Sequence, residues 1–312
     1  MTDLGLSLSK SWADLSEPLL LFFFRQLATD KPMAEIQTLC LCQWANVLVR
    51  CRLYGSVYLV QHGKQQTKLT LHQFVCAITA LDFLKSFSQY PIRIRTIGKA
   101  RAIEADFQGV PFSTFISVDN YYQCFLHTKN EALLKELATL LYPKVKKSQL
   151  TTPLLLNAFY WFSSQKHCFA RLFPHFLQPM SSSSEDFLGY APPIGEVLRT
   201  AMNARIRALT GGDITKEEAV LSMDTWRALT ELDAKAKEVE DIKRQTKRQT
   251  RTSIGMHHLS LKHLHPKTNQ LRQKNFDSAV FPDWKDLKKL FSISNLQLTS
   301  LPSLIYHKDI QS

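Results

Sequence analysis

Cysteine and histidine are the residues in this sequence best able to bind a metal or to act as nucleophiles. The six cysteines include no C-x-x-C pair, and Cys40, Cys42 and Cys51 come nearest to the spacing of a shared zinc site. No second pair of ligands follows at the spacing that structural zinc sites use. Histidines at 257, 258, 263 and 265 form a loose cluster without matched cysteines or carboxylates. We therefore predict no metal site.

Other signatures of catalysis are also missing from the sequence. It contains no glycine-rich phosphate loop, no H-E-x-x-H and no G-x-S-x-G, and its 10 glycines are few for a nucleotide-binding fold. His167 and Cys168 are neighbours in sequence, which does not by itself make a catalytic pair. Glu104 and Asp106 form a single i,i+2 carboxylate pair. We predict that the protein is not an enzyme and has no catalytic residue and no cofactor.

Positive charge is the clearest chemical bias, and it is unevenly distributed. The formal net charge is +12, and residues 246–312 alone hold 11 lysines and arginines against four acidic residues. A basic tail of this kind is typical of proteins that contact nucleic acid or an acidic protein surface, although a solvated, solubilising tail fits the same pattern. Its first candidate contacts are Lys247, Arg248 and Arg251.

A second basic candidate is the segment PIRIRTIGKARAI at 91–103, which has the alternation of a β ribbon turning at Gly98. One face would be apolar, and a basic face could bind phosphates. The alternative, which we favour, is that the basic face is the solvated side of a one-sided sheet. The residues predicted on that face are Arg93, Arg95, Lys99 and Arg101.

The elements that must position these residues predict an α+β fold. Helical spacing runs over 16–29 and 70–87, and the alternating segment 48–69 between them, with turn signals at Gly55 and Gly63, predicts short antiparallel strands. The aromatic segment 151–177 predicts a long core helix, although part of its aromatic stripe could instead form a partner groove.

Composition also predicts the domain boundaries. The serine- and proline-rich stretch at 178–193 is low in bulk, which is typical of a flexible linker. We predict a mostly helical domain with a small antiparallel sheet at 1–180, a linker at 181–194, a helical hairpin at 195–245, and a basic tail at 246–312 that ends in a short amphipathic helix.

The hairpin carries the clearest helix signals in the chain. Gly211 and Gly212 end its first arm, and Thr215 with Glu218 forms a T-x-x-E capping box for the second. Apolar residues of the second arm recur about every 3.3 residues, close to the 3.5 of a coiled-coil seam. This seam could dock on the N-terminal domain, pair with a second copy or bind a partner. The candidate partner-binding residues are Met223, Trp226, Leu229, Leu232 and Val239.

Three blocks of this sequence resemble a family of uncharacterised proteins from bacterial prophages and related mobile elements. They are DFQGVPFSTFISVDNYYQCFLHT, FYWFSSQKHCFARLFPHFLQP and AMNARIRALTGGDITKEEAVLSMDTWRALTELDAKAKE, and the resemblance covers roughly 10–245. The family in turn resembles phage tail-assembly proteins. The resemblance implies a non-enzymatic tail-assembly chaperone that coats a helical tape-measure protein. Residues 246–312 lie outside it, as a fused or frame-shifted extension would.

Location and partners follow from the same features. The opening MTDLGLSLSK lacks the pattern of a secretory signal, and the apolar run at 18–24 is far shorter than a membrane span. We predict a cytoplasmic protein of the bacterial host cell with a protein partner, tape-measure-like or a second copy, and no membrane contact. The alternative function is nucleic-acid binding by a mobile-element protein through its basic ribbon and tail.

Overall fold

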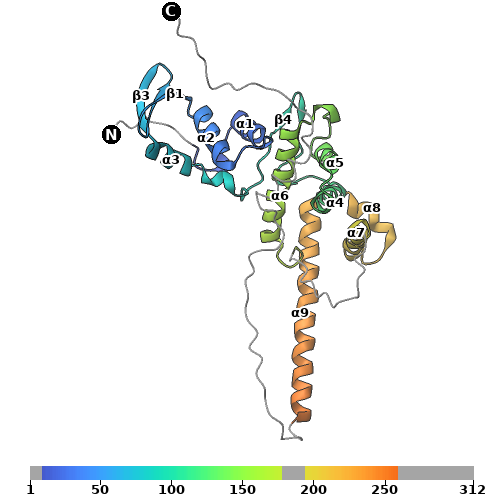
Figure 1. The fold of residues 1–312 in the computed structure, drawn as a ribbon. Coiled ribbons are helices and arrows are strands. Elements are labelled where there is room, and N and C mark those ends of the chain that lie inside the picture. The colour runs from blue at the N-terminus through green and yellow to red at the C-terminus, as the bar shows by residue number, and fades with distance from the viewer. Residues whose placement is uncertain (1–8, 178–193, 259–312) are drawn as a thin grey trace, which may run out of the picture.

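The computed structural model describes residues 9–177 and 194–258, with side chains described as far as 246. Helices dominate it, and one three-stranded and one two-stranded antiparallel sheet complete the fold (Figure 1). The predicted α+β class is therefore confirmed. The α-helices are α1 (Glu17–Leu27), α2 (Met33–Trp44), α3 (Leu71–Thr79), α4 (Phe112–Thr128), α5 (Glu131–Leu141), α6 (Thr152–Leu172), α7 (Ile194–Thr210), α8 (Glu217–Leu221) and α9 (Thr225–His258).

In the described residues, one short 3₁₀ turn precedes α1 and three more lie between later helices. They are η1 (Trp12–Asp14), η2 (Asp82–Lys85), η3 (Lys147–Gln149) and η4 (Ile214–Lys216). The first helix begins as its sequence predicts, because Pro18 lies in the first turn, where a missing N–H breaks no intrahelical hydrogen bond. Phe23 and Phe24 of α1 are fully buried, and this helix packs against α2 and α6.

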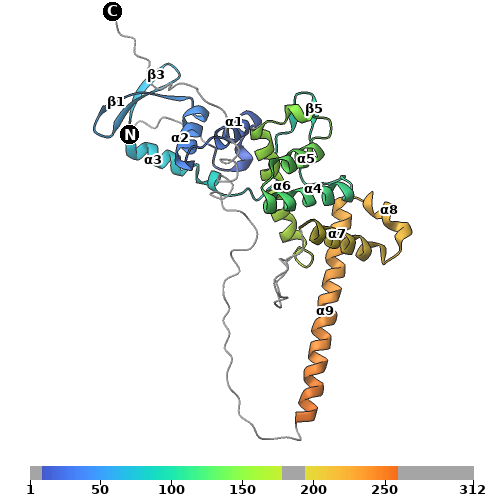
Figure 2. The ribbon, with the colours of Figure 1, turned by 45° about the vertical axis from the view of Figure 1, so that its right-hand side comes forward.

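The larger sheet consists of β1 (Val47–Tyr54), β2 (Val57–His62) and β3 (Gln65–Thr70) in that order. Two-residue turns join the strands, and Gly55 and Gly63 supply the positive φ angles of 53° and 58° that such turns require. The predicted strands are confirmed. Figures 1 and 2 show this sheet, with α3 beside it, at the end of the molecule away from α9.

The core forms where α4, α5 and α6 meet. Every residue of α6 from 154 to 165 is buried, so this helix is surrounded on all sides. Its aromatic side chains pack edge-to-face and stacked, as in the Tyr122–Phe159 pair, whose ring centroids lie 5.2 Å apart. The aromatic segment is therefore core, as predicted, and the alternative of a partner groove is wrong.

The basic ribbon is much shorter than predicted. Only β4 (Thr96–Ile97) and β5 (Ala100–Arg101) pair with each other. In the segment before β4, side chains take the hydrogen-bonding places of a partner strand. The backbone N–H of Ile94 donates to Asn157 Oδ1 at 3.0 Å, and its carbonyl accepts from the Tyr142 hydroxyl at 2.9 Å. Because the side chains of Tyr142 and Asn157 satisfy the backbone of Ile94, this residue needs no partner strand, and the ribbon begins only at Arg95, whose carbonyl accepts from the N–H of Ala102 at 2.9 Å.

The second arm of the hairpin begins later than its capping-box signature predicts. Thr215 lies in η4, where its backbone N–H donates to Asp213, and α8 ends after a single turn and a half. The long helix α9 instead starts at Thr225. Asp224 caps it by accepting hydrogen bonds from the backbone N–H groups of Trp226 and Arg227 at 2.9 and 3.2 Å. The predicted capping box of Thr215 with Glu218 is therefore wrong.

Two of the predicted domain boundaries can be compared with the structure. The helix α9 continues to His258, so the boundary set at residue 245 falls inside a helix, and the first part of the predicted basic tail is helical. The linker at 181–194 and the amphipathic helix near the end of the sequence lie almost entirely outside the described residues.

Candidate protein-binding surfaces

Trp226 holds the start of α9 against the body of the protein. Its indole N–H donates to the carbonyl oxygen of Asp106 at 2.7 Å. The ring also meets Phe169 and Phe173 edge-to-face, with centroid distances of 5.6 and 5.9 Å. A buried indole N–H usually finds such a partner, and here the partner lies in the loop that precedes α4. Trp226 is thus a contact inside the protein.

The neighbouring seam residues are covered in the same way. Leu229 is fully buried and Leu232 is 3% exposed, while Met223 is partly buried against the same core. The seam of the second arm therefore docks on the N-terminal body at its first four predicted positions. Burial leaves almost nothing of Leu229 and Leu232 for a partner to contact, whereas Met223 and Trp226 stay partly exposed, so the assignment of these two as partner-binding residues stays a prediction.

The backbone at the start of α9 is fixed as firmly as its side chains. The N–H of Phe112 donates to the carbonyl of Met223 at 2.8 Å, and the N–H of Thr225 donates to the carbonyl of Val110 at 2.9 Å. The carboxylate of Asp224 also accepts from the N–H of Gly109 at 2.6 Å. These bonds hold residues 223 and 224 in non-helical geometry, which explains the late start of α9.

A further contact between α9 and the body, the Asp233 clamp, lies two turns along the helix. No sequence motif indicates it. One carboxylate oxygen of Asp233 accepts hydrogen bonds from the backbone N–H groups of His175 and Phe176, at 2.8 and 2.9 Å. The ring Nδ1 of His175 lies 3.3 Å from the carboxylate of Glu240. The segment after α6 is thereby tied to α9 as far as residue 240.

Beyond this clamp α9 leaves the body of the protein (Figure 1). Val239 is 49% exposed and Ile242 is 62% exposed, and the two are spaced i,i+3 on neighbouring turns. From residue 241 to its end at His258 the helix extends by about 27 Å at 1.5 Å per residue. Val239 is therefore the most exposed of the predicted partner-binding residues.

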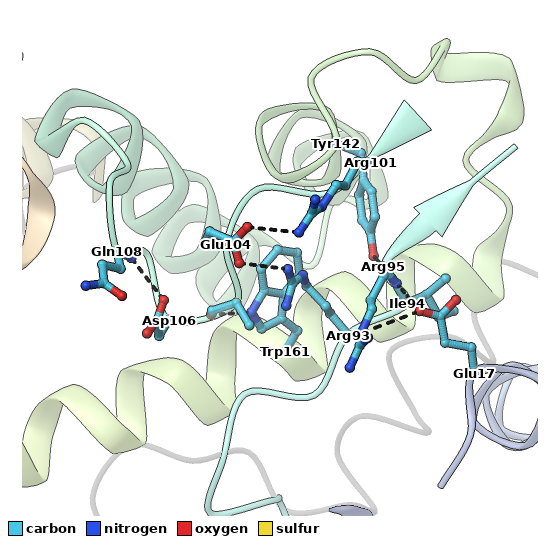
Figure 3. Close-up of polar contacts among 11 residues, drawn as sticks. Glu17, Arg93, Ile94, Arg95, Arg101, Glu104, Asp106, Gln108, Tyr142 and Trp161 are labelled. Atoms are coloured by element: carbon cyan, nitrogen blue, oxygen red, sulfur yellow. Dashed lines mark hydrogen bonds and ion pairs between the residues drawn. The ribbon is translucent and has the colours of Figure 1, made fainter. Parts of the chain in front are cut away.

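Arg93 of the basic ribbon is not available to an external ligand. Figure 3 shows its guanidinium between Glu104 and the ring of Trp161. The Nη2 to Oε2 distance is 3.3 Å, and the guanidinium carbon lies 5.5 Å from the ring centroid. Burial lowers the pKa of Arg93, an effect that the nearby Glu104 opposes. The prediction that Arg93 faces solvent is wrong, because this side chain is 11% exposed.

The other ribbon cations remain at the surface, although two of them lie beside carboxylates. Arg101 is 3.3 Å from Glu104, and the backbone N–H of Arg95 donates to Glu17 at 3.0 Å (Figure 3). Lys99 is exposed at the turn. The ribbon is thus a weaker phosphate site than its sequence suggests. Lys247, Arg248 and Arg251 lie in the last part of α9, where side chains are outside the described structure.

A buried charge cluster attaches α7 to the body. Asp119 of α4 is 3% exposed and pairs with Lys166 of α6 at 2.5 Å and with Arg205 of α7 at 3.1 Å. Burial alone would raise the pKa of Asp119, but the two cations together outweigh it and lower that pKa below its ordinary value. Removing either cation would leave a carboxylate with incomplete compensation inside the protein.

The described residues offer neither a metal site nor a membrane span. No group of three or more histidine, cysteine or acidic side chains lies close enough together there to hold a metal ion. Within the same ranges, none of the helices has both the length and the apolar character needed to cross a membrane. Comparisons of the chain with protein-family models, with curated proteins and with solved structures find no match.

Proposed function

We propose that this chain is a non-catalytic binding protein that holds a helical protein partner along the projecting part of α9. By its resemblance to prophage proteins, the partner would be a tape-measure protein and the chain a tail-assembly chaperone, acting in the cytoplasm of the bacterial host. The observation that carries the proposal is the exposure of Val239 and Ile242 on a helix whose preceding turns are fixed to the body.

The pattern around these residues favours a helical partner. Val239 and Ile242 continue the seam that Leu229 and Leu232 bury on the body, so the same apolar stripe runs from a covered to an uncovered stretch. A stripe at i,i+3 is what a second helix packs against, and a partner helix would extend the seam without rearranging the body. Charges of both signs flank the stripe, which is typical of positions that set partner choice.

The test is a pull-down of the full chain co-expressed with the tape-measure protein of the same phage element. We expect the two to copurify, and we expect the double substitution Val239→Asp/Ile242→Asp to abolish this because it places carboxylates inside the contact. The control is Lys237→Asp, which makes the same change in net charge at an exposed position on the opposite side of α9. Loss of copurification in both variants, or in neither, would show that Val239 and Ile242 do not form the partner-binding surface.

A second candidate function is nucleic-acid binding by the distal end of α9. It rests on the finding that the helix continues to His258, so that Arg244, Lys247, Arg248 and Arg251 are spaced at steps of three, one and three along one helix. Positions with these steps share one side of a helix. A helix with a basic side can bind phosphates, and such binding weakens steeply with added salt.

A further inference from the structure

The three-stranded sheet and α3 form a lobe that carries only positive charge. No aspartate or glutamate occurs between Glu35 and Asp82, a stretch that contains Arg50, Arg52, Lys64 and Lys68. In a chain with 27 acidic residues this is a long interval, and it contains most of α2, the whole three-stranded sheet and α3. The lobe therefore presents a positive potential that its own residues do not neutralise.

The strand β1 is the exposed edge of that lobe. Val47 is buried, whereas all seven residues from 48 to 54 are exposed. Among the described residues β1 pairs with β2 alone, so the hydrogen-bonding groups along its other edge meet no strand. Such an edge accepts an added strand readily, and proteins usually protect it.

Apolar side chains on this edge make it unusual. Leu48 and Tyr54 are 52% and 66% exposed, and Val49 and Leu53 are about two-fifths exposed, at 41% and 39%. The backbone N–H of Leu71, itself 47% exposed, donates to the carbonyl of Ser56 at 2.7 Å and so brings another apolar side chain to the β1–β2 turn. Exposed apolar residues gathered on one element indicate a binding surface.

The two arginines of β1 have partners that leave their charge uncompensated. Arg50 donates to the side-chain oxygen of Gln61, and the Nε of Arg52 donates to the carbonyl of Gly55 at 2.6 Å. Both acceptors are neutral, and neither arginine pairs with a carboxylate in the described part of the chain. These contacts hold the guanidinium groups beside β1 and leave them able to attract an anionic ligand.

The same charges argue against a second copy of this chain as the occupant. Antiparallel pairing of two β1 strands would bring Arg50 and Arg52 of one copy next to those of the other, and like charges across strands are destabilising. The register of β1 with β2 also shifts twice, between Val49 and Cys51 and between Arg52 and Tyr54. These bulges twist the edge and limit the length of any strand that can pair with it, which favours a short segment over a full second β1.

We propose that β1 binds a short, extended, acidic and apolar segment of a protein partner as an added strand. Carboxylates of the segment would meet Arg50 and Arg52, and its apolar residues would cover Leu48 and Leu53. Three of the four exposed apolar residues of β1 are aliphatic and only Tyr54 is aromatic, which favours a peptide over nucleic acid, whose successive bases stack on aromatic rings. This surface lies away from α9 (Figures 1 and 2) and is independent of the helical partner proposed above.

The test measures fluorescence anisotropy of labelled peptides with the full chain. One peptide alternates glutamate and valine, a second has lysine in place of glutamate, and a third is the acidic peptide N-methylated at alternate residues. We expect the acidic peptide alone to bind, and we expect Arg50→Glu/Arg52→Glu to weaken it by about tenfold or more and to gain affinity for the lysine peptide. The control Lys99→Glu/Lys144→Glu makes the same charge change at exposed lysines elsewhere and should leave binding unchanged.

Each other outcome would overturn the proposal. Equal binding of the acidic and N-methylated peptides would exclude strand addition, because methylation removes the backbone donors that an added strand needs. If the β1 variant and the control variant lose affinity for the acidic peptide to the same extent, β1 is not the binding site. A single-stranded oligonucleotide that binds through Arg50 and Arg52 where the acidic peptide does not would identify nucleic acid as the ligand. Circular dichroism confirms that each variant is folded.

Discussion

The indole nitrogen of Trp226 and the carbonyl oxygen of Asp106 are joined by a hydrogen bond of 2.7 Å between segments 120 residues apart in sequence. This bond fixes the first turn of α9 to the loop before α4. It makes the most conspicuous aromatic residue of the hairpin an internal anchor, and it moves the candidate partner surface outward along the helix to Val239 and Ile242.

Substitution of Trp226 should therefore destabilise the free protein. We expect Trp226→Ala to lower the free energy of unfolding by about 3 kcal/mol, because it removes packing against Phe169 and Phe173. Trp226→Phe keeps a ring and should cost about 1 kcal/mol through the lost hydrogen bond. Urea denaturation followed by circular dichroism measures both. Unchanged unfolding of the alanine variant would show that Trp226 does not anchor α9.

Asp233 should control how firmly the segment after α6 is held. We expect Asp233→Ala to leave the N–H groups of His175 and Phe176 without their acceptor, at a cost of about 1–2 kcal/mol, and to speed hydrogen exchange at these two amides. Asp233→Asn retains an acceptor oxygen and should lie between the wild type and the alanine variant. If the three proteins exchange alike at residues 175 and 176, the clamp does not form in solution.

The buried Asp119 predicts a specific dependence of stability on pH. Its pKa is lowered in the folded protein, so its contribution is complete above the unfolded-state value of 3.8 and disappears as the pH falls through the lower, folded-state value. Asp119→Asn should cost about 3 kcal/mol at pH 7, because Lys166 and Arg205 lose their counterion. The difference from the wild type should shrink in acid. Urea titrations at pH 7 and in this acidic range would show it, and a difference that grows in acid would contradict the assignment.

The two basic regions should respond differently if the chain binds nucleic acid. We expect Lys247→Ala/Arg248→Ala/Arg251→Ala to weaken binding and reduce its dependence on salt. Arg93→Ala should leave that dependence unchanged, but it should destabilise the fold by about 2 kcal/mol, because Arg93 lies buried between Glu104 and Trp161. Mobility shifts at several salt concentrations provide the measurement. Absence of any mobility shift would exclude nucleic acid as a ligand.

Local patterns predicted the elements that depend on local chemistry. The strands at 47–70 follow from alternation and from glycines at two-residue turns, and α6 follows from its unbroken aromatic and apolar composition. The start of α9 could not be predicted from local pattern, because Thr215 and Asp224 are both good helix caps. Long-range hydrogen bonds to Val110 and Phe112 decide between them.

The candidate site was predictable only in part for the same reason. The seam of α9 was visible in the sequence, but apolar spacing does not tell which surface covers each residue. The structure places Leu229 on the body and leaves Val239 exposed, although both obey the same periodicity. Alternation at Ile92–Arg95 likewise predicted a ribbon, where Asn157 and Tyr142 satisfy the backbone in place of a strand. In neither case does sequence spacing contain the deciding contact.

Hydrogen–deuterium exchange along α9, measured in the free chain and in the complex with the co-expressed tape-measure protein, shows which turns of the helix bind the partner. In the free chain we expect slow exchange at 225–235, where the helix is docked, and fast exchange at 241–246. The partner should slow amide exchange at residues 239–246 and leave exchange at 225–235 unchanged. If the partner instead protects residues 225–235 while 239–246 still exchange fast, the exposed part of α9 is not its binding site.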